Sequence, residues 1–366
     1  MTTTENVKEP LFKMSKRHTI SFPKRWLIRL IAVVLGLIVC AIFITVITKL
    51  NPVEVYKGII NGAVGTGRRA WVTVREMLVL LLVSLGLTPA FKMRFWNIGA
   101  EGQVLVGGIA SAALMIYVGD KLPNAALLIL IFVVSMLAGL IWGVVPAIFK
   151  AYFNTNETLF TLMLNYVAIQ LVSYCIVFWE NPVGSNSVGV INSATSAGWF
   201  PEVFGLTYGL NVILVLVITV GMYIYLRFTK HGYEIAVVGE SENTARYAGI
   251  SVKGVIIRTM ALSGAICGLA GALVVSGASH TISTTISGGR GFTAIIVAWM
   301  SKLNPFAMII VSFFLCFMQE GTMQIAADYG LNESSSDIIT GILLFFLIGC
   351  EFFINYKVSF RKNHKE

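Results

Sequence analysis

The chain has 366 residues, of which 56% are hydrophobic and only 12% are charged. A soluble globular domain carries about 25% charged residues, so this composition excludes a chain whose surface mostly faces water. The net charge of +9 raises the possibility of nucleic-acid binding, but no basic stripe with interleaved aromatic residues exists outside the apolar blocks. The lysines and arginines gather at the two ends of the chain and beside one polar loop, which is the positive-inside distribution of a membrane protein.

The hydrophobic residues come in blocks roughly 20 residues long, the length of a helix that crosses a ~30 Å hydrocarbon core. Lipid offers the backbone no hydrogen-bond partner, so continuous apolar blocks that do not alternate predict helices. The predicted spans are about 27–48, 77–91, 97–118, 126–149, 159–179, 210–228, 256–276 and 338–354, with two short segments at 292–300 and 306–319. We therefore expect an all-α, polytopic membrane protein with about ten transmembrane helices.

The polar segments define the expected domains and topology. A basic cytoplasmic tail at 1–25 precedes the transmembrane domain at 26–356, and a second cytoplasmic tail at 357–366 follows it. Residues 180–207 contain no Lys or Arg and are expected outside, whereas the long polar segment 229–255 is expected inside. Both termini are then cytoplasmic.

Two regions depart from a simple succession of spans. Residues 51–76 are expected to form an extracytoplasmic connection. They nevertheless carry four basic residues, Lys57, Arg68, Arg69 and Arg75. An interfacial amphipathic segment is one explanation for this exception. The apolar block 292–300 is too short to span alone, and such discontinuities are tolerated only where protein or a cavity replaces lipid.

The sequence contains no recognisable catalytic or metal-binding pattern. The glycine-rich run at 287–291 lacks the Lys and Ser/Thr of a phosphate-binding loop, and no strand precedes it. The five cysteines lie in apolar stretches and never form a CxxC pair, and the four histidines are scattered. We therefore expect no catalytic residue, no metal site and no nucleic-acid partner.

Polar side chains within spans are costly and are therefore candidates for a functional site. Asn97, Glu101 and Gln103 lie around the start of one span, and Asn165 lies within another, eight residues after Glu157. These four residues are the candidate polar lining of a solute path. For Glu101 the alternative is a carboxylate that stabilises a helix N-terminus. For Asn165 the alternative is a hydrogen bond between helices.

The polar segment 229–255 predicts a short helix. Ser241 and Glu242 suit a helix start and Gly249 suits a helix end, with Ala245 and Ala248 expected on one face. A short cytoplasmic helix between two spans would allow a soluble motor to dock. An ordinary solvated loop helix remains the alternative.

Three stretches, in order along the chain, carry a resemblance to a known family. They are residues 95–108 (FWNIGAEGQVLVGG), residues 156–168 (NETLFTLMLNYVA) and residues 238–271 (VGESENTARYAGISVKGVIIRTMALSGAICGLAG). Together they resemble ABC-importer permeases of the branched-chain amino acid and simple-sugar superfamily. The NIGAEGQ and TLMLNY forms are most similar to permeases of nucleoside importers that work with basic-membrane-protein-type binding lipoproteins.

The resemblance implies a type II-like importer fold in a bacterial cytoplasmic membrane. It implies a second permease subunit, homologous or identical, two ATPase subunits and an extracytoplasmic substrate-binding lipoprotein. ATP and Mg would bind to the ATPase subunits, and this chain would be no enzyme and would hold no cofactor itself. It also implies that Glu240, Glu242, Ala245, Ala248 and Gly249 belong to the segment that couples the permease to the ATPases.

Other functions remain open on the sequence alone. The solute expected from the resemblance is a nucleoside, with simple sugars as the alternative within the superfamily. An ion-coupled secondary transporter would need a titrating carboxylate in the membrane, for which Glu101 is the candidate. A membrane enzyme would need a cluster of His, Asp or Glu at one interface, which the sequence does not offer.

Overall fold

The computed structural model describes residues 12–17, 21–203, 205–330 and 333–360. Most of the predicted basic tail at 1–25 and of the tail at 357–366 therefore lies outside the described residues. The chain divides into two compact units. One comprises residues 1–69 and 317–366, and the other comprises residues 70–316.

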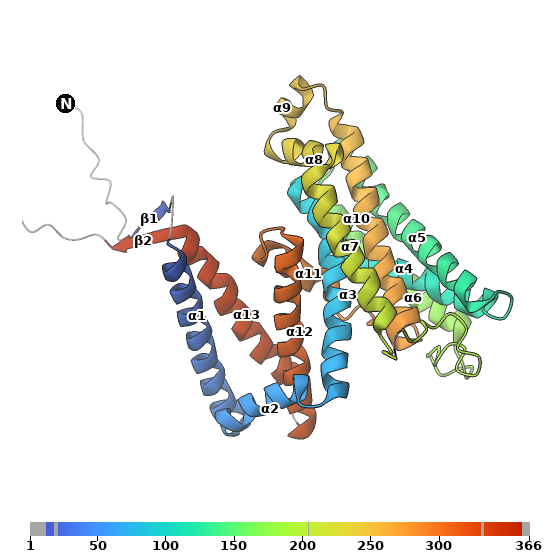
Figure 1. Ribbon diagram of the computed structural model, residues 1–366, viewed down its shortest axis with the longest axis horizontal. Helices are drawn as coiled ribbons and strands as arrows, with labels where there is room; N and C mark the ends of the chain where they lie inside the picture. Colours follow the sequence, from blue (N-terminus) through green and yellow to red (C-terminus); the bar gives the residue numbers. More distant parts are fainter. Residues whose placement is uncertain (1–11, 18–20, 204, 331–332, 361–366) are drawn as a thin grey trace, which may run out of the picture. The chain divides into compact units, whose positions relative to one another are not determined.

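Nine helices of the described part of the chain are long and apolar enough to cross a membrane (Figure 1). They are α1 (Phe22–Phe43), α3 (Gly67–Lys92), α4 (Ala100–Val118), α5 (Asn124–Phe153), α6 (Glu157–Trp179), α7 (Gly209–Phe228), α10 (Val252–Val274), α12 (Pro305–Asp328) and α13 (Glu333–Asn355). The shorter apolar helix α11 (Arg290–Met300) occupies the predicted interrupted region. These ten helices confirm the predicted all-α, polytopic fold.

The unit formed by the two ends of the chain contains α1, α2 (Pro52–Val64) and α13. Helix α1 continues into the π-helix η1 (Ile44–Thr48) and packs against α13. Arg29 of α1 and Glu351 of α13 form an ion pair with an N–O distance of 2.6 Å. Strands β1 (Phe12–Lys16) and β2 (Tyr356–Phe360) are antiparallel partners. Because β1 precedes α1 and β2 follows α13, the pairing brings these ends of the two helices together.

The predicted connection at 51–76 is only partly correct. Asn51 caps α2, since its side chain accepts a hydrogen bond from the backbone N–H of Val53 at 3.0 Å. Helix α3 already begins at Gly67. Arg75 therefore lies within a helix rather than in a connecting segment. The sequence prediction started this helix ten residues too late because its first turns carry three arginines.

Helix α10 is the centre of the unit formed by residues 70–316. It packs against α4 and α5, and it carries Gly264 and Gly268, which lie four residues apart. A Cβ at Gly264 would lie 2.2 Å from the carbonyl oxygen of Gly139, and one at Gly268 would lie 2.3 Å from that of Ser135. Any larger residue would separate the helices, so the small residues set how closely α10 and α5 approach.

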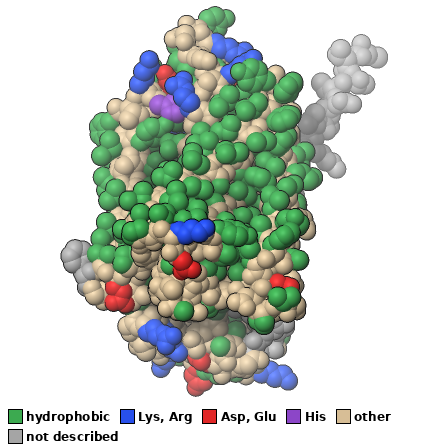
Figure 2. Space-filling view, turned by 90° about the vertical axis from the view of Figure 1, so that its right-hand side faces the viewer, with side chains coloured by type: hydrophobic (Ala, Val, Ile, Leu, Met, Phe, Trp, Pro, Cys, Tyr) green, Lys and Arg blue, Asp and Glu red, His purple; other side chains and the backbone are tan. Residues whose placement is uncertain are grey.

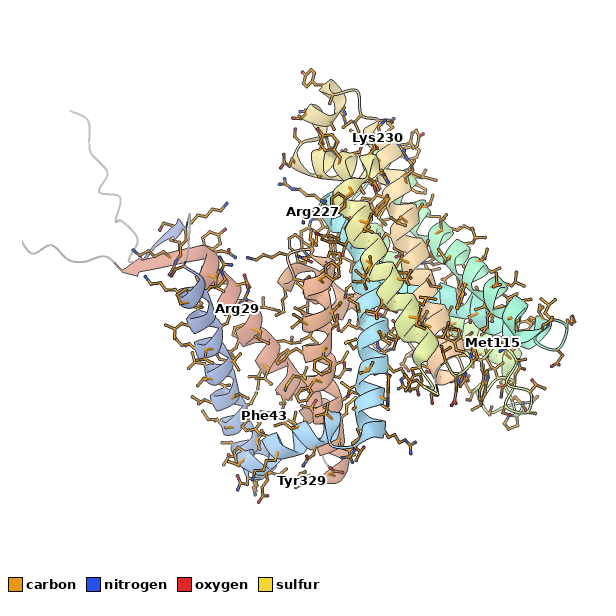
Figure 3. The ribbon with its side chains drawn as sticks, in the orientation of Figure 1. Arg29, Phe43, Met115, Arg227, Lys230 and Tyr329 are labelled. Atoms are coloured by element: carbon orange, nitrogen blue, oxygen red, sulfur yellow. The ribbon has the colours of Figure 1, made fainter. Side chains whose placement is uncertain are left out.

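Helices α7 and α10 are joined at one end by two short helices, α8 (Lys230–Glu240) and α9 (Glu242–Tyr247). Figure 3 shows Arg227 and Lys230 at this end of the unit and Met115 toward the opposite end. The polar loop after α6 lies at the Met115 end, where Asn192 donates a hydrogen bond to the Met115 carbonyl at 2.7 Å. The loop without Lys or Arg and the segment with α8 and α9 are therefore at opposite ends of the unit.

The surface between these ends is apolar. The face drawn in Figure 2 carries a broad band of hydrophobic side chains, with lysines and arginines both above and below it. Helices α5, α6 and α7 expose large apolar residues along their lengths, among them Ile141, Val177 and Val217. Such a surface suits contact with lipid tails rather than with water.

Candidate functional site

The predicted interrupted region consists of turns followed by a short apolar helix. The π-helix η2 (Val275–Ser279) ends α10, and turns then lead to α11. Gly288 and Gly289 have φ angles of +58° and +71°, a conformation that glycine adopts without strain. Helix α11 therefore begins abruptly at Arg290, as the predicted interruption required. Such a half-helix exposes unpaired backbone N–H groups at its start.

Glu101 supplies partners for these N–H groups. Its carboxylate accepts hydrogen bonds from the backbone N–H of Gly289 at 3.1 Å and of Gly291 at 2.8 Å. Glu101 stands in the first turn of α4, but the N-terminus that its carboxylate contacts belongs to α11. A Cβ at Gly291 would lie 2.3 Å from the backbone nitrogen of Glu101. Glycine at 291 therefore allows α4 and α11 to meet backbone to backbone.

A second connection reaches the start of α11 from α3. Arg290 forms an ion pair with Glu76, whose carboxylate also accepts a hydrogen bond from Nε of Arg75 at 2.8 Å. The Glu76 side chain is 12% exposed and both arginine side chains are 23% exposed. One carboxylate thus faces two guanidinium groups in a mostly desolvated setting. The sequence analysis missed this cluster because it considered Arg75 a loop residue and did not consider Glu76.

Asn97 lies in the segment between α3 and α4, and Gln103 lies in the first turns of α4. Asn97 Nδ2 donates to the Ser263 hydroxyl of α10 at 3.1 Å, and the Asn97 and Gln103 amides lie 3.4 Å apart. Asn97 Oδ1 also accepts the backbone N–H of Gly99 at 3.0 Å. Both side chains are buried. These amides therefore fix the turn before α4 against α10.

Asn165 of α6 binds the same turn from the other side. Its Nδ2 donates to the carbonyl of Ile98 at 2.9 Å, and its Oδ1 accepts the backbone N–H of Gly102 at 2.9 Å. The Thr161 hydroxyl accepts the N–H of Ile98 at 3.2 Å. The bond to Gly102 joins α6 to α4, as the alternative of a hydrogen bond between helices predicts. The bond to Ile98 reaches the turn just before α4.

The four candidate path residues therefore meet around one turn, and all are buried. Their hydrogen bonds connect the start of α4 with α6, α10 and α11. Beside them, the rings of Trp96 and Trp299 stack with centroids 5.5 Å apart, and each side chain is about half exposed. No group of three or more His, Cys, Asp or Glu side chains suited to a metal exists among the described residues.

The predicted coupling segment forms α9 and the end of α8. Ser241 caps α9, since its hydroxyl accepts the backbone N–H of Thr244 at 3.2 Å, and Gly249 ends it with a φ of +74°. Ala245 and Ala248, which were expected on one face, differ in exposure. Ala245 is fully buried, whereas Ala248 is exposed. The reason is α8, which the sequence analysis did not predict and against which α9 packs.

Two further features of this end, one exposed and one buried, were not predicted. Tyr247 is 94% exposed at the last position of α9, although it is a large aromatic residue. Gly239 of α8 lies against the end of α3, where a Cβ would come within 2.2 Å of the Lys92 carbonyl oxygen. Helix α8 thus connects the exposed helix α9 to a long helix of the same unit.

Comparison with known proteins identifies the chain's relatives. It is 27% identical over 333 residues to the nucleoside ABC transporter permease protein NupB of Lactococcus lactis, covering 88% of this chain and 91% of that protein. It is 29% identical to the guanosine ABC transporter permease protein NupP of Bacillus subtilis, covering 88% and 92%. It is also 29% identical to a glucose ABC transporter permease protein of Haloferax volcanii, covering 76% of each chain. No solved structure matches the chain.

The family described as the permease component of the branched-chain amino acid transport system matches residues 69–348. This range includes the interrupted crossing, the buried amides and the pair α8–α9. It agrees with the resemblance seen in the three sequence stretches. The chain therefore belongs to this family of ABC transporter permeases and is a multi-pass membrane protein.

Proposed function

We propose that this permease imports nucleosides across a bacterial cytoplasmic membrane, driven by ATP hydrolysis on separate subunits. The observation that carries the solute assignment is the similarity, over nearly the whole chain, to two permeases named for nucleoside or guanosine transport. Simple sugars are the second candidate, supported by the glucose permease of Haloferax volcanii. The paired guanosine permeases NupP and NupQ of Bacillus subtilis support a second permease subunit as partner.

The remaining partners of the proposed complex are two ATPase subunits, which hold ATP and Mg, and an extracytoplasmic binding lipoprotein. Both termini are cytoplasmic in this proposal. The pairing of β1 with β2 supports it, because it places the start of α1 and the end of α13 beside each other. In this proposal α11, with the turns before it, is one of ten crossings. An even number of crossings returns the chain to the side on which it started.

Transport follows from two arrangements of the permease, each favoured by a different state of the motor. The proposed docking surface is the segment Glu240 to Gly249, with Tyr247 and Ala248 as its most accessible part. Movement of α9 passes to α8, whose Gly239 touches the backbone at the end of α3. Helix α3 carries Glu76, which holds the start of α11 through Arg290. This chain of contacts supports a route from the motor to the interrupted crossing.

Asn97, Glu101, Gln103 and Asn165 are the polar side chains of the proposed path. A nucleoside offers hydroxyl groups and a base edge for hydrogen bonds, and a base face for stacking. The stacked rings of Trp96 and Trp299 beside Asn97 support a stacking role, since aromatic faces accept any base. Replacing Asn97, Gln103 and Asn165 by alanine one at a time tests the path. Unchanged uptake in all three variants would remove these residues from it.

The function itself is tested with proteoliposomes that contain the complete complex and ATP inside. A labelled nucleoside should accumulate, and unlabelled nucleosides should compete where glucose does not. Competition by glucose alone would replace the nucleoside with a sugar. Uptake that collapses with the proton gradient and ignores ATP would indicate an ion-coupled secondary transporter.

A further inference from the structure

A basic cavity lies at the α8 end of the unit formed by residues 70–316. Its volume is about 320 Å³. Eight residues line it: Lys92, Tyr223, Leu226, Arg227, Lys302, Leu303, Asn304 and Pro305. Three of these residues are basic, and none carries a carboxylate. The side chains that line the cavity are therefore basic or uncharged.

The three basic residues come from three different parts of the fold. Lys92 ends α3, and its Nζ donates to the Leu226 carbonyl near the end of α7 at 2.9 Å. Arg227 follows on α7 and donates to the Tyr223 hydroxyl at 2.7 Å. Lys302 stands in the turn between α11 and α12, with a φ of +53°. This turn holds the third basic residue beside the other two.

The start of α12 adds a further attraction for an anion. Asn304 precedes this helix, and its side chain accepts the backbone N–H of Phe306 at 3.0 Å. Asn304 and Pro305 both line the cavity, so the positive end of the α12 dipole faces it. The dipole of α12 and the charge of the basic side chains thus both favour an anionic ligand.

Apolar surface continues from the rim of the cavity along both neighbouring helices. The rings of Tyr223 and Phe306 lie 5.0 Å apart and join α7 to α12. Farther along α12, Ile310 is 73% exposed, and along α7 Val217 is 66% exposed. A ligand with an anionic head and apolar tails would fit this arrangement. The head would lie in the basic cavity, and the tails would lie on the apolar surface of α7 and α12.

We propose that this cavity binds the phosphate group of an anionic membrane phospholipid, whose acyl chains lie along α7 and α12. Basic cavities between transmembrane helices are suited to anionic headgroups. A lipid fits better than a soluble phosphate because only a lipid also uses the exposed apolar faces. The proposal needs only the membrane location of the chain, so it stands apart from the nucleoside assignment.

The test measures lipid retention by native mass spectrometry of the purified full-length complex as detergent strips lipid away. The complex is first placed in bilayers of phosphatidylcholine that contain phosphatidylglycerol. The wild type should retain phosphatidylglycerol preferentially. The double variant Arg227→Gln with Lys302→Gln should lose it about thirty-fold more readily, since each basic side chain near an anionic surface contributes about a factor of five.

Two matched variants separate charge from folding. The variant Arg227→Lys with Lys302→Arg keeps both charges and should retain the lipid. Lys253→Gln removes a charge from the start of α10, where Lys253 lies over the Tyr152 ring away from the cavity, and should also retain it. Loss of retention in the charge-keeping variant would contradict the proposal, because charge would then not be the cause.

The remaining outcomes distinguish the sources of the phosphate. Excess inorganic phosphate should not displace the lipid, and displacement would show a site for free phosphate instead. Equal retention of phosphatidylcholine would overturn the preference for an anionic lipid. If the isolated permease retains the lipid and the assembled complex does not, a protein partner occupies the cavity and the proposal is wrong.

Discussion

The carboxylate of Glu101 accepts hydrogen bonds from the backbone N–H groups of Gly289 and Gly291, 188 and 190 positions along the chain. These groups begin α11, where the helix has no carbonyl partners of its own and its dipole is positive. A single side chain of α4 thus stabilises the start of α11. This contact makes the start of α11 depend on the position of α4.

Replacing Glu101 with alanine should destabilise the protein. Each buried N–H left without a partner costs about 1–3 kcal/mol, and Glu101→Ala leaves two. Glu101→Gln should be intermediate because the amide keeps one oxygen acceptor. The measurement is the thermal unfolding midpoint of the purified permease. Glu180→Ala is the control, since Glu180 accepts the N–H groups of Gly184 and Asn186 in an exposed loop.

In the Glu180 variant, water can replace the lost acceptor, so the midpoint should change little. Equal midpoints for Glu101→Ala and the wild type would show that the contact contributes nothing to stability.

The ion-pair cluster predicts unequal effects of removing its members. Glu76→Gln leaves Arg75 and Arg290 close together without a carboxylate and should cost about 3–5 kcal/mol, as for other broken buried pairs. Arg290→Gln leaves Glu76 paired with Arg75 and should cost less. Denaturant titration of both variants gives the comparison. The prediction fails if Arg290→Gln is the more destabilised protein.

The two alanines of α9 should respond differently to enlargement. Ala248→Trp places a large side chain on an exposed position and should reduce uptake while folding is preserved, with ATP hydrolysis no longer linked to transport. Ala245→Trp should destabilise the protein, because a fully buried position cannot accept the volume. Uptake, ATP hydrolysis and the unfolding midpoint are measured on both. Normal uptake by the Ala248 variant would exclude α9 as the docking helix.

Stability should fall as the pH drops below about 6.5, the ordinary histidine pKa. Burial lowers the pKa of His231 in α8, and the nearby Arg258 lowers it further, while Glu234 opposes this. Burial and Arg75 also lower the pKa of His280, which stacks on Trp199. The folded protein therefore binds fewer protons than the unfolded chain between the lowered and the ordinary pKa, so unfolding becomes easier on acidification.

The unfolding midpoint measured across this pH range checks the prediction. Replacing His231 and His280 together by glutamine should flatten the acid side of the curve. A wild-type midpoint that rises on acidification would mean that the sign of these pKa shifts is wrong.

The sequence allowed the spans, the short apolar segment at 292–300 and the helix after Ser241 to be predicted, because each has a local signal. The pairing of Glu76 with Arg290 has no local signal in the sequence, because these residues are 214 positions apart. The burial of Ala245 could not be predicted either. Which face of α9 is covered depends on α8, and residues 230–240 resemble a polar loop rather than a helix.

Asn165 illustrates the same limit within the candidate path. Its depth in a span predicted a buried amide that needs a partner. The partners are backbone groups of Ile98 and Gly102, and backbone groups leave no trace in side-chain patterns. Sequence reasoning therefore predicted an amide that needs a partner and left its contacts open.

The sidedness of α9 tests the central claim most directly, because an ATPase can reach this permease only from the cytoplasm. Tyr247→Cys and Val183→Cys form a matched pair, with wild-type side chains 94% and 91% exposed at opposite ends of their unit. A membrane-impermeant thiol reagent applied to intact cells should label the cysteine at 183 and leave the one at 247 unlabelled until the cells are opened. Labelling at position 247 in intact cells would place α9 outside and contradict the assignment of this chain as a motor-driven importer.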